Sequence, residues 1–336
     1  MKRILSLLLC ALLVFSFAGC SGNNNPVNSS EDASSEAPYT AVDINIGAIK
    51  GPTGVGMVSL MADADSKKAA NNYNFTVTGA PDEIVGKISS KELDIAAVPT
   101  NLAATLYNKT KGGVKILAVN TYSVLSVIEV GTSVNSVEDL KGKTIYSTGE
   151  GSNPEYILRY ILERNGIDPD KDVKIEFLTS NDELATKIVS GAINLAVVPE
   201  PAASTVLKKA LTARRALLLG KEWEKVAPES ALMMGCVIVR TEFLENNPNA
   251  VAKFLEEYEK SVNAVSDVTK TAELCVNYEI IANEEIALSA IPNCGIAFCA
   301  GNDMKTKLSG YLQVLFEANP KSIGGAIPDD AFYYIG

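Results

Sequence analysis

The sequence predicts an α/β protein with two lobes, each a mostly parallel sheet flanked by helices, and a ligand cleft between the lobes. Short apolar segments alternate with helical patterns through two thirds of the chain, as in βαβ units. The segment "ELDIAAVPTNLAATL" at residues 92–106 is closely matched by "AINLAVVPEPAASTV" at residues 192–206. The length of 336 residues is that of two domains rather than one.

The chain begins with the pattern of a secretion signal. Two basic residues precede an almost entirely apolar run, residues 4–17, which is short for a transmembrane helix. The small pair Ala-Gly directly before Cys20 resembles the bacterial lipoprotein cleavage site. We therefore expect residues 1–19 to be removed and lipid to be attached to Cys20. The alternative is an ordinary signal peptide in which the cysteine lies there by chance.

A polar segment, residues 20–41, follows the signal. It is rich in Ser, Asn, Pro and acidic residues and poor in aliphatic residues. Such a segment cannot bury enough apolar surface to offset the entropy cost of ordering it. We expect a disordered tether that holds the globular body away from a membrane.

The first βα series spans residues 43–122. Its third strand is a continuous apolar run, as expected of a parallel strand buried on both faces. We expect strands at residues 43–50, 75–79, 93–99 and 115–122, and helices at residues 57–65, 80–92 and 100–109.

The second series repeats this order. We expect strands at residues 124–130, 143–148, 173–179, 193–199 and 215–220, and helices within residues 149–167, 180–191 and 200–211. Between residues 82–106 and 182–206 many residues recur in register, which indicates two lobes of one design.

The last third is mostly helical. Residues 247–265 carry the apolar stripe of an amphipathic helix, and residues 305–320 form a further helix. We expect the strand at residues 233–240 to pair with residues 124–130, after which the chain returns to the first lobe. The predicted lobes are residues 42–122 with 246–336, and residues 123–245.

Ligands of open α/β sheets lie beyond the carboxyl ends of the strands, so the turns that follow the strands are the candidate site. Free backbone N–H groups and glycines in these turns allow a ligand to approach closely. The predicted ligand-binding residues are Thr53, Gly54, Val55 and Gly56, then Thr100, Asn101 and Tyr122 in the first lobe, and Glu150, Gly151, Ser152, Asn153 and Glu200 in the second.

Structural alternatives exist for these residues. Both glycine-rich turns can be tight turns only, and the first lacks the Gly-Lys-Ser/Thr element of a Walker loop. Asn101 and Asn153 can cap helices, with the proline after Asn153 at the first helical position. The Glu200 carboxylate can simply be stabilised by the partial positive charge at the N-terminus of its helix, and Tyr122 can pack at a hinge.

Composition excludes several functions. The sequence has no His, which removes the usual catalytic base and the commonest metal ligand. The formal charge of −10 becomes −12 without the two basic residues of the signal, so nucleic acid is not an expected partner. We expect no metal and no cofactor. Four acidic residues at helix starts fit capping rather than catalysis: Asp82, Glu83, Asp182 and Glu183.

Two further side-chain types leave their roles open. Cys236, Cys275, Cys294 and Cys299 remain beyond the signal; a local disulfide between the last two and buried free thiols are the alternatives. Trp223 lies among charged residues in "GKEWEK", which predicts surface packing on the second lobe.

The sequence resembles the extracytoplasmic solute-binding proteins of ABC importers over nearly all of residues 43–265. The segments that carry the resemblance are "EDLKGKTI" (138–145), "GEGSNPEYIL" (149–158), "GIDPDKDVKIEFL" (166–178), "KIVSGAINLAVVPEP" (187–201) and "NPNAVAKFL" (247–255). The nearest group binds nitrate, sulfonates, taurine and thiamine pyrimidines and has the class II periplasmic-binding-protein fold. The chain from about residue 270 is less typical of it.

This resemblance implies a monomer, not an enzyme, that captures a small solute by hinge closure and delivers it to a membrane permease with its ATPase. It would be lipid-anchored outside the cytoplasmic membrane, at the cell surface or in the periplasm. An enzyme on the same frame and a surface sensor without transport are the alternatives. Helix N-termini favour an anionic ligand, whereas Glu150 and Glu200 favour amine or amidine donors, so the ligand stays open.

Overall fold

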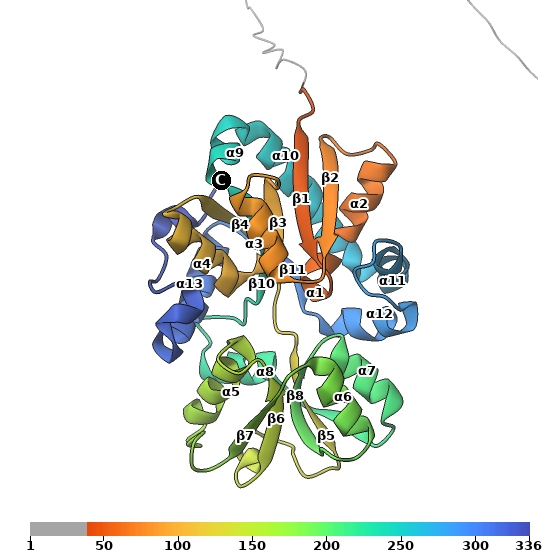
Figure 1. The fold of residues 1–336 in the computed structure, drawn as a ribbon, viewed down its shortest axis with the longest axis vertical. Coiled ribbons are helices and arrows are strands. Elements are labelled where there is room, and N and C mark those ends of the chain that lie inside the picture. Colours follow the sequence, from red (N-terminus) through yellow and green to blue (C-terminus); the bar gives the residue numbers. More distant parts are fainter. Residues whose placement is uncertain (1–38) are drawn as a thin grey trace, which may run out of the picture. The chain divides into compact units, whose positions relative to one another are not determined.

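The computed structural model describes residues 39–336. The signal sequence, Cys20 and most of the predicted tether lie outside these residues. The described chain forms two mixed sheets surrounded by helices (Figure 1). We call each sheet with its helices a lobe.

The first lobe is built on a six-stranded sheet with the order β11-β4-β10-β3-β1-β2. β1 pairs in parallel with β2 and β3, whereas β10 is antiparallel to β3 and β4, and β11 is antiparallel to β4. Only β10 and β11 therefore run against the other strands. The strands are β1 (Asp43–Ile49), β2 (Asn72–Thr78), β3 (Ile95–Pro99), β4 (Val114–Thr121), β10 (Gly235–Arg240) and β11 (Ile296–Ala300).

The second lobe is built on a five-stranded sheet with the order β7-β6-β8-β5-β9. β6 is parallel to β7 and β8, and β5 is antiparallel to β8 and β9, so only β5 runs against the others. The predicted α/β class with two mostly parallel sheets is confirmed. The strands are β5 (Leu125–Val130), β6 (Thr144–Thr148), β7 (Lys174–Leu178), β8 (Leu195–Pro199) and β9 (Ala213–Leu218).

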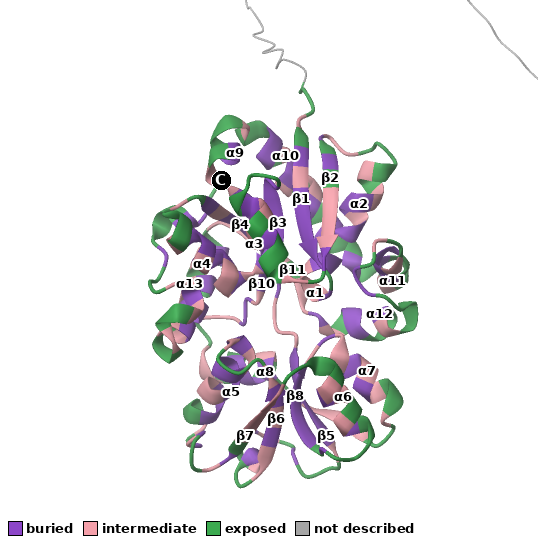
Figure 2. Cartoon of the chain, viewed as in Figure 1, coloured by how far each residue is buried: buried purple, intermediate pink, exposed green. Residues whose placement is uncertain are grey.

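Helices cover both sheets, and their buried faces turn inward (Figure 2). The first lobe has α1 (Pro52–Val55), α2 (Val58–Asp65), α3 (Pro81–Ser89), α4 (Thr100–Thr110), α9 (Thr241–Asn246), α10 (Pro248–Asn263), α11 (Val268–Asn277), α12 (Glu284–Ala290) and α13 (Gly301–Ala318). The second lobe has α5 (Asn153–Arg164), α6 (Asn181–Val189), α7 (Ala202–Lys209) and α8 (Leu219–Val226).

The internal repeat folds into the same unit in both lobes. Helices α3 and α6, and strands β3 and β8, begin one hundred positions apart. In both lobes the second residue after the helix has a left-handed backbone conformation: Lys91 (φ 64°) after α3 and Gly191 (φ 75°) after α6. An equivalent backbone hydrogen bond then precedes the strand in each lobe: the N–H of Leu93 donates to Lys87 O (3.1 Å), and the N–H of Ile193 donates to Lys187 O (3.2 Å). The prediction of two lobes of one design is therefore confirmed at this unit.

Strand β10 lies in the first sheet, so the predicted pairing of residues 233–240 with residues 124–130 is wrong. β5 already has β8 and β9 on its two sides. β10 instead fills the place between β3 and β4, where Gly235–Val239 are all buried. A strand with consecutive buried residues, covered on both faces, is typical of the interior of a sheet, and the first sheet provides a neighbour on each side of it.

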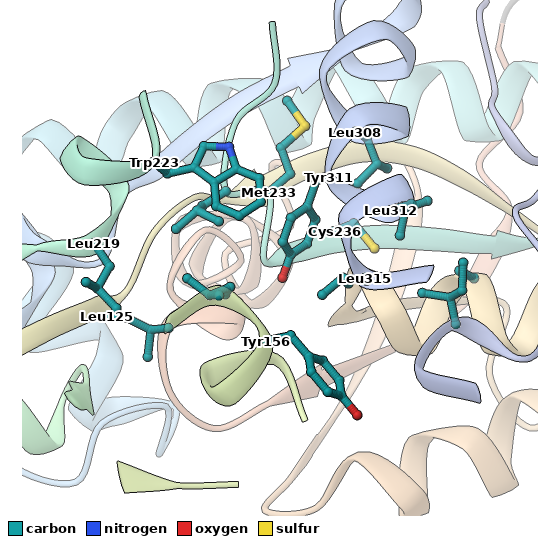
Figure 3. Packing of buried hydrophobic residues seen from close by; sticks show 14 of the residues in the cluster. Leu125, Tyr156, Leu219, Trp223, Met233, Cys236, Leu308, Tyr311, Leu312 and Leu315 are labelled. Carbon is teal, nitrogen blue, oxygen red and sulfur yellow. The ribbon is translucent and has the colours of Figure 1, made fainter. Parts of the chain in front are cut away.

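One apolar cluster joins elements of both lobes (Figure 3). Trp223 of α8 is fully buried, and its ring lies 5.7 Å from that of Tyr311 of α13, edge to face. The ring of Tyr160 of α5 is 4.8 Å from the same indole, and the indole N–H donates to Ser230 Oγ (2.9 Å). The prediction that Trp223 packs on the surface is therefore wrong. The reason is that α13, remote in sequence, covers the indole.

Candidate functional site

The turns that follow the strands of the two lobes meet at one place. The side chain of Asn153 in the second lobe donates to Asn101 Oδ1 in the first (3.2 Å). Both residues follow strands of the sheets, β6 and β3. The carboxyl ends of the parallel strands are thus brought together, as expected for a cleft between two α/β lobes.

A pocket of about 840 Å³ is lined by residues of both lobes. The first lobe contributes turns after β1 and β2 and the segment between α11 and α12, and the second contributes the starts of α6 and α7. The lining residues are Lys50, Gly51, Gly79, Val276, Glu279, Ile280, Ile281 and Ala282, with Ser180, Asn181, Asp182 and Pro201 opposite. Its size is within the range of small-molecule sites.

The first glycine-rich turn is held by the core. Thr53 is half-buried and its carbonyl accepts from Asn120 Nδ2 (3.0 Å). A Cβ on Gly54 would lie 2.6 Å from Ile49 O, and one on Gly56 would lie 3.0 Å from Val262 Cγ2. The carbonyl of Gly56 also accepts from Ser261 Oγ (2.7 Å). Val55 is fully buried. The two glycines are therefore explained by packing, and Gly51, with φ 99°, is the residue of this turn that lines the pocket.

In the matching turn of the second lobe, most hydrogen-bond donors bond to the turn itself or to the helix that follows it. The N–H of Gly151 donates to Glu155 Oε2 (2.7 Å), and both the N–H (3.0 Å) and the hydroxyl (2.6 Å) of Ser152 donate to Gly149 O. Glu150 is exposed. Ser152 occupies the N-cap position of α5, so the alternative that placed Asn153 there is wrong. Asn153 instead begins the helix and reaches the other lobe.

Thr100, Asn101 and Asn153 hold the lobes in register. Thr100 is fully buried and its hydroxyl donates to Met233 O (2.6 Å) in the segment that returns from the second lobe. Asn153 is 8% exposed, and its Oδ1 has no hydrogen-bond partner. This pair is therefore one polar contact between the lobes, and a ligand amide or amine could donate a hydrogen bond to its free oxygen.

Glu200 forms a buried ion pair. Its side chain is fully buried, one carboxylate oxygen pairs with Arg215 Nη2, and the other accepts from the N–H of Ser204 (3.2 Å). Arg215 also donates to Ser204 Oγ (2.9 Å), while its Nε is buried without a partner. The carboxylate therefore compensates the charge of the partly buried Arg215 and accepts a hydrogen bond from a backbone N–H in the first turn of α7. Cys294 lies close by, where burial and the charge of Glu200 raise the pKa of its thiol well above the usual value.

Tyr122 lies where the chain leaves the first lobe. It is half-buried, and its N–H donates to Gly295 O (2.8 Å). Burial, with a hydrogen bond to the Cys299 thiol, raises the pKa of its hydroxyl. Tyr122 also lines a second pocket, of about 270 Å³, with residues of both lobes.

Within residues 39–336, no cluster of three or more potential ligand side chains could hold a metal ion. The four cysteines in this part of the chain are free thiols. None of its helices is long and apolar enough to cross a membrane.

Several pocket residues were not among the predicted ones. Gly79, Ser180 and Asn181 follow strand ends, a signal that the sequence contained and that could have identified them. Ile280 and its neighbours lie in a segment that no sequence pattern connects with the strand ends.

Comparison with known proteins agrees with this geometry. The model of a family described as "ABC transporter, phosphonate, periplasmic substrate-binding protein" matches residues 62–265. No curated protein sequence matches the chain. Among solved structures, the chain is similar to an ABC transporter protein from Parabacteroides distasonis, with 22% identity over 87% of this chain and 98% of the other and a TM-score of 0.73.

Two further structures share the fold at lower identity. The periplasmic aliphatic sulphonate binding protein SsuA from Escherichia coli is 13% identical over 87% of this chain and 92% of its own, with a TM-score of 0.66. The periplasmic nitrate-binding protein NrtA from Synechocystis is 14% identical over 76% of this chain and 69% of its own, with a TM-score of 0.51.

Proposed function

We propose that this chain, which belongs to the phosphonate family of periplasmic substrate-binding proteins and is the substrate-binding component of an ABC importer, captures a small organic solute by hinge closure. The observation that carries the proposal is the pocket of about 840 Å³ whose walls come from both lobes. A ligand in this pocket contacts both lobes and so favours the closed arrangement over the open one.

Two crossings of the chain would form the hinge. The first connects β4 to β5 through residues 122–124, and the second connects α8 to β10 through residues 227–234. They are tied together by the N–H of Met234, which donates to Thr121 O (2.9 Å). Because β10 belongs to the first sheet, we place the second crossing before residue 235 and propose lobes of residues 42–122 with 235–336, and residues 123–234.

The ligand would be contacted by pocket residues and by the predicted residues closest to them. Gly51, Gly79, Asn181 and Pro201 are the central proposals. In the part of the cleft between the pocket and the hinge, the ligand would also contact predicted residues: Thr53, Asn101, Tyr122, Glu150 and Asn153. Thr100 and Glu200 would act by holding the cleft walls in position.

Gly79 offers a direct test. A Cβ built on Gly79 meets no atom within 4 Å, so Gly79→Leu should fold and project a branched side chain into the pocket. Gly86 on α3 is exposed and equally open, which makes Gly86→Leu the matched control. A bound solute at one hundred times its dissociation constant should stabilise the wild-type protein by about 2.7 kcal/mol in a thermal-shift screen.

We expect Gly79→Leu to abolish this stabilisation and Gly86→Leu to retain it. If both variants were still stabilised by the solute and had normal unfolding midpoints without it, the binding site would lie outside this pocket.

Proteins of this family work outside the cytoplasm with a membrane permease, and the family consists of solute-binding proteins rather than enzymes. Neither the enzyme nor the sensor alternative is favoured. We propose in addition that the chain is monomeric and is anchored by lipid at Cys20, with residues 1–19 removed as a signal. Cys20→Ser should release the protein from the membrane fraction or leave an uncleaved precursor; unchanged fractionation and mass would contradict the anchor.

A further inference from the structure

The segment between α11 and α12 forms one wall of the interlobe pocket. Four of the lining residues belong to it, Glu279, Ile280, Ile281 and Ala282, and Val276 lies in the last turn of α11. This segment lies beyond residue 265, where the match to the family model ends. Lys50 and Gly51, which precede residue 62, also lie outside the match, so the family model does not describe these two parts of the pocket.

Contacts on both sides hold this wall in place. Lys50 Nζ lies 2.9 Å from Glu279 Oε2, and the N–H of Gly51 donates to Ile280 O (2.8 Å). Tyr278 Oη donates to Asp65 Oδ2 (2.6 Å) on α2. The helix that follows, α12, lies beside α7 of the other lobe (Figure 1). Glu285 of α12 pairs with Lys208 of α7. A change in lobe position would therefore move this wall relative to the ligand.

The charges of the pocket oppose an anionic ligand. The charged lining residues are one cation, Lys50, and two carboxylates, Asp182 and Glu279. Lys50 is already paired with Glu279, and Asp182 has no ion-pair partner among the described residues. The start of α6 carries a partial positive charge of about half a unit, but two acidic residues occupy its first turn. No cation of the pocket is left to compensate a phosphonate group.

We propose that Glu279 and Asp182 determine specificity by selecting a solute with an amine, amidine or other N–H-rich group and by disfavouring a phosphonate dianion. The inference rests on the proposed function and names the solute class of the same pocket. The carboxylates of Glu279 and Asp182 accept hydrogen bonds from the solute.

The test uses two probes of each class with the full protein in calorimetric titrations: putrescine and 4-aminopyridine, against ethylphosphonate and ethanesulfonate. The double variant Asp182→Asn/Glu279→Gln removes both carboxylates at nearly constant size. Its matched control, Glu256→Gln/Glu273→Gln, neutralises two exposed carboxylates that each pair with a lysine one helical turn away and lie outside the pocket.

We expect the wild-type protein to bind one of the N–H-bearing probes at one per chain. The pocket variant should weaken this binding roughly tenfold, since two exposed charge contacts each contribute up to about fivefold, and the control should not change it. Preference for ethylphosphonate or ethanesulfonate, or equal loss in both variants, would overturn the inference and leave the proposed function intact. Absence of binding by all four probes would overturn the inference, whereas the proposed function is tested separately by the thermal-shift screen with Gly79→Leu.

Discussion

Removal of the Glu200 carboxylate should destabilise the protein strongly. The side chain is fully buried and pairs with Arg215, whose side chain is 21% exposed. Removing one partner of a buried pair costs about 3–5 kcal/mol, because the other charge is left uncompensated. Arg215 keeps its bond to Ser204 Oγ (2.9 Å) and some contact with solvent, so we expect about 3 kcal/mol for Glu200→Ala.

The assay is urea unfolding followed by the fluorescence of Trp223, which is the only tryptophan and is fully buried. Glu224→Ala is the control, because Glu224 pairs with Lys221 on the surface, where such a pair contributes at most about 1 kcal/mol. The double variant Glu200→Ala/Arg215→Leu should be more stable than Glu200→Ala alone. A loss below about 1 kcal/mol for Glu200→Ala, or a further loss in the double variant, would refute the account of Glu200 as the buried partner of Arg215.

Three other outcomes follow from the same structure. Trp223→Ala should cost about 4 kcal/mol in urea unfolding followed by circular dichroism, since it empties the centre of the cluster that joins both lobes, and a cost near 1 kcal/mol would show that this cluster is not packed as described. Burial acts to raise the pKa of Glu129, but hydrogen bonds from Ser133, Val134 and Arg214 outweigh it and lower that pKa. The Glu129 carboxylate therefore stabilises the fold fully above about pH 4.3, and this contribution is lost as the pH falls through the lowered pKa of the folded state. Glu129→Gln should flatten the acid side of the plot of unfolding free energy against pH. An unchanged slope would contradict this. The half-buried Cys299 should react first with a thiol reagent, while Cys236, whose pKa burial raises, reacts only on unfolding; equal rates would contradict the burial of Cys236.

Local patterns predicted the repeated unit correctly because its determinants lie close together in sequence. A capped or proline-started helix, a left-handed turn residue and an apolar strand follow one another within about 20 residues in both lobes. The place of β10 could not be predicted in this way. An apolar strand suits either sheet, and only the pairing of β5 with β8 and β9 decides that β10 belongs to the other.

The candidate site shows the same division between local and remote determinants. The internal use of the Gly151 N–H was predictable in principle, since Glu155 lies four residues later at the start of a helix. The burial of Trp223 depends on Tyr311, and the pairing of Glu200 depends on Arg215 of β9, which is separated from β8 by β5 in the sheet. Such contacts are set by tertiary packing, which no local pattern encodes.

Small-angle X-ray scattering tests the central claim most directly. The protein is measured alone and with a saturating solute identified by the thermal-shift screen, and Gly79→Leu is measured under the same conditions. If a solute binds between two lobes and closes them, the radius of gyration of the wild-type protein should fall on binding, and that of Gly79→Leu should not respond. A solute that binds at one per chain and leaves the wild-type radius of gyration unchanged would contradict capture by hinge closure.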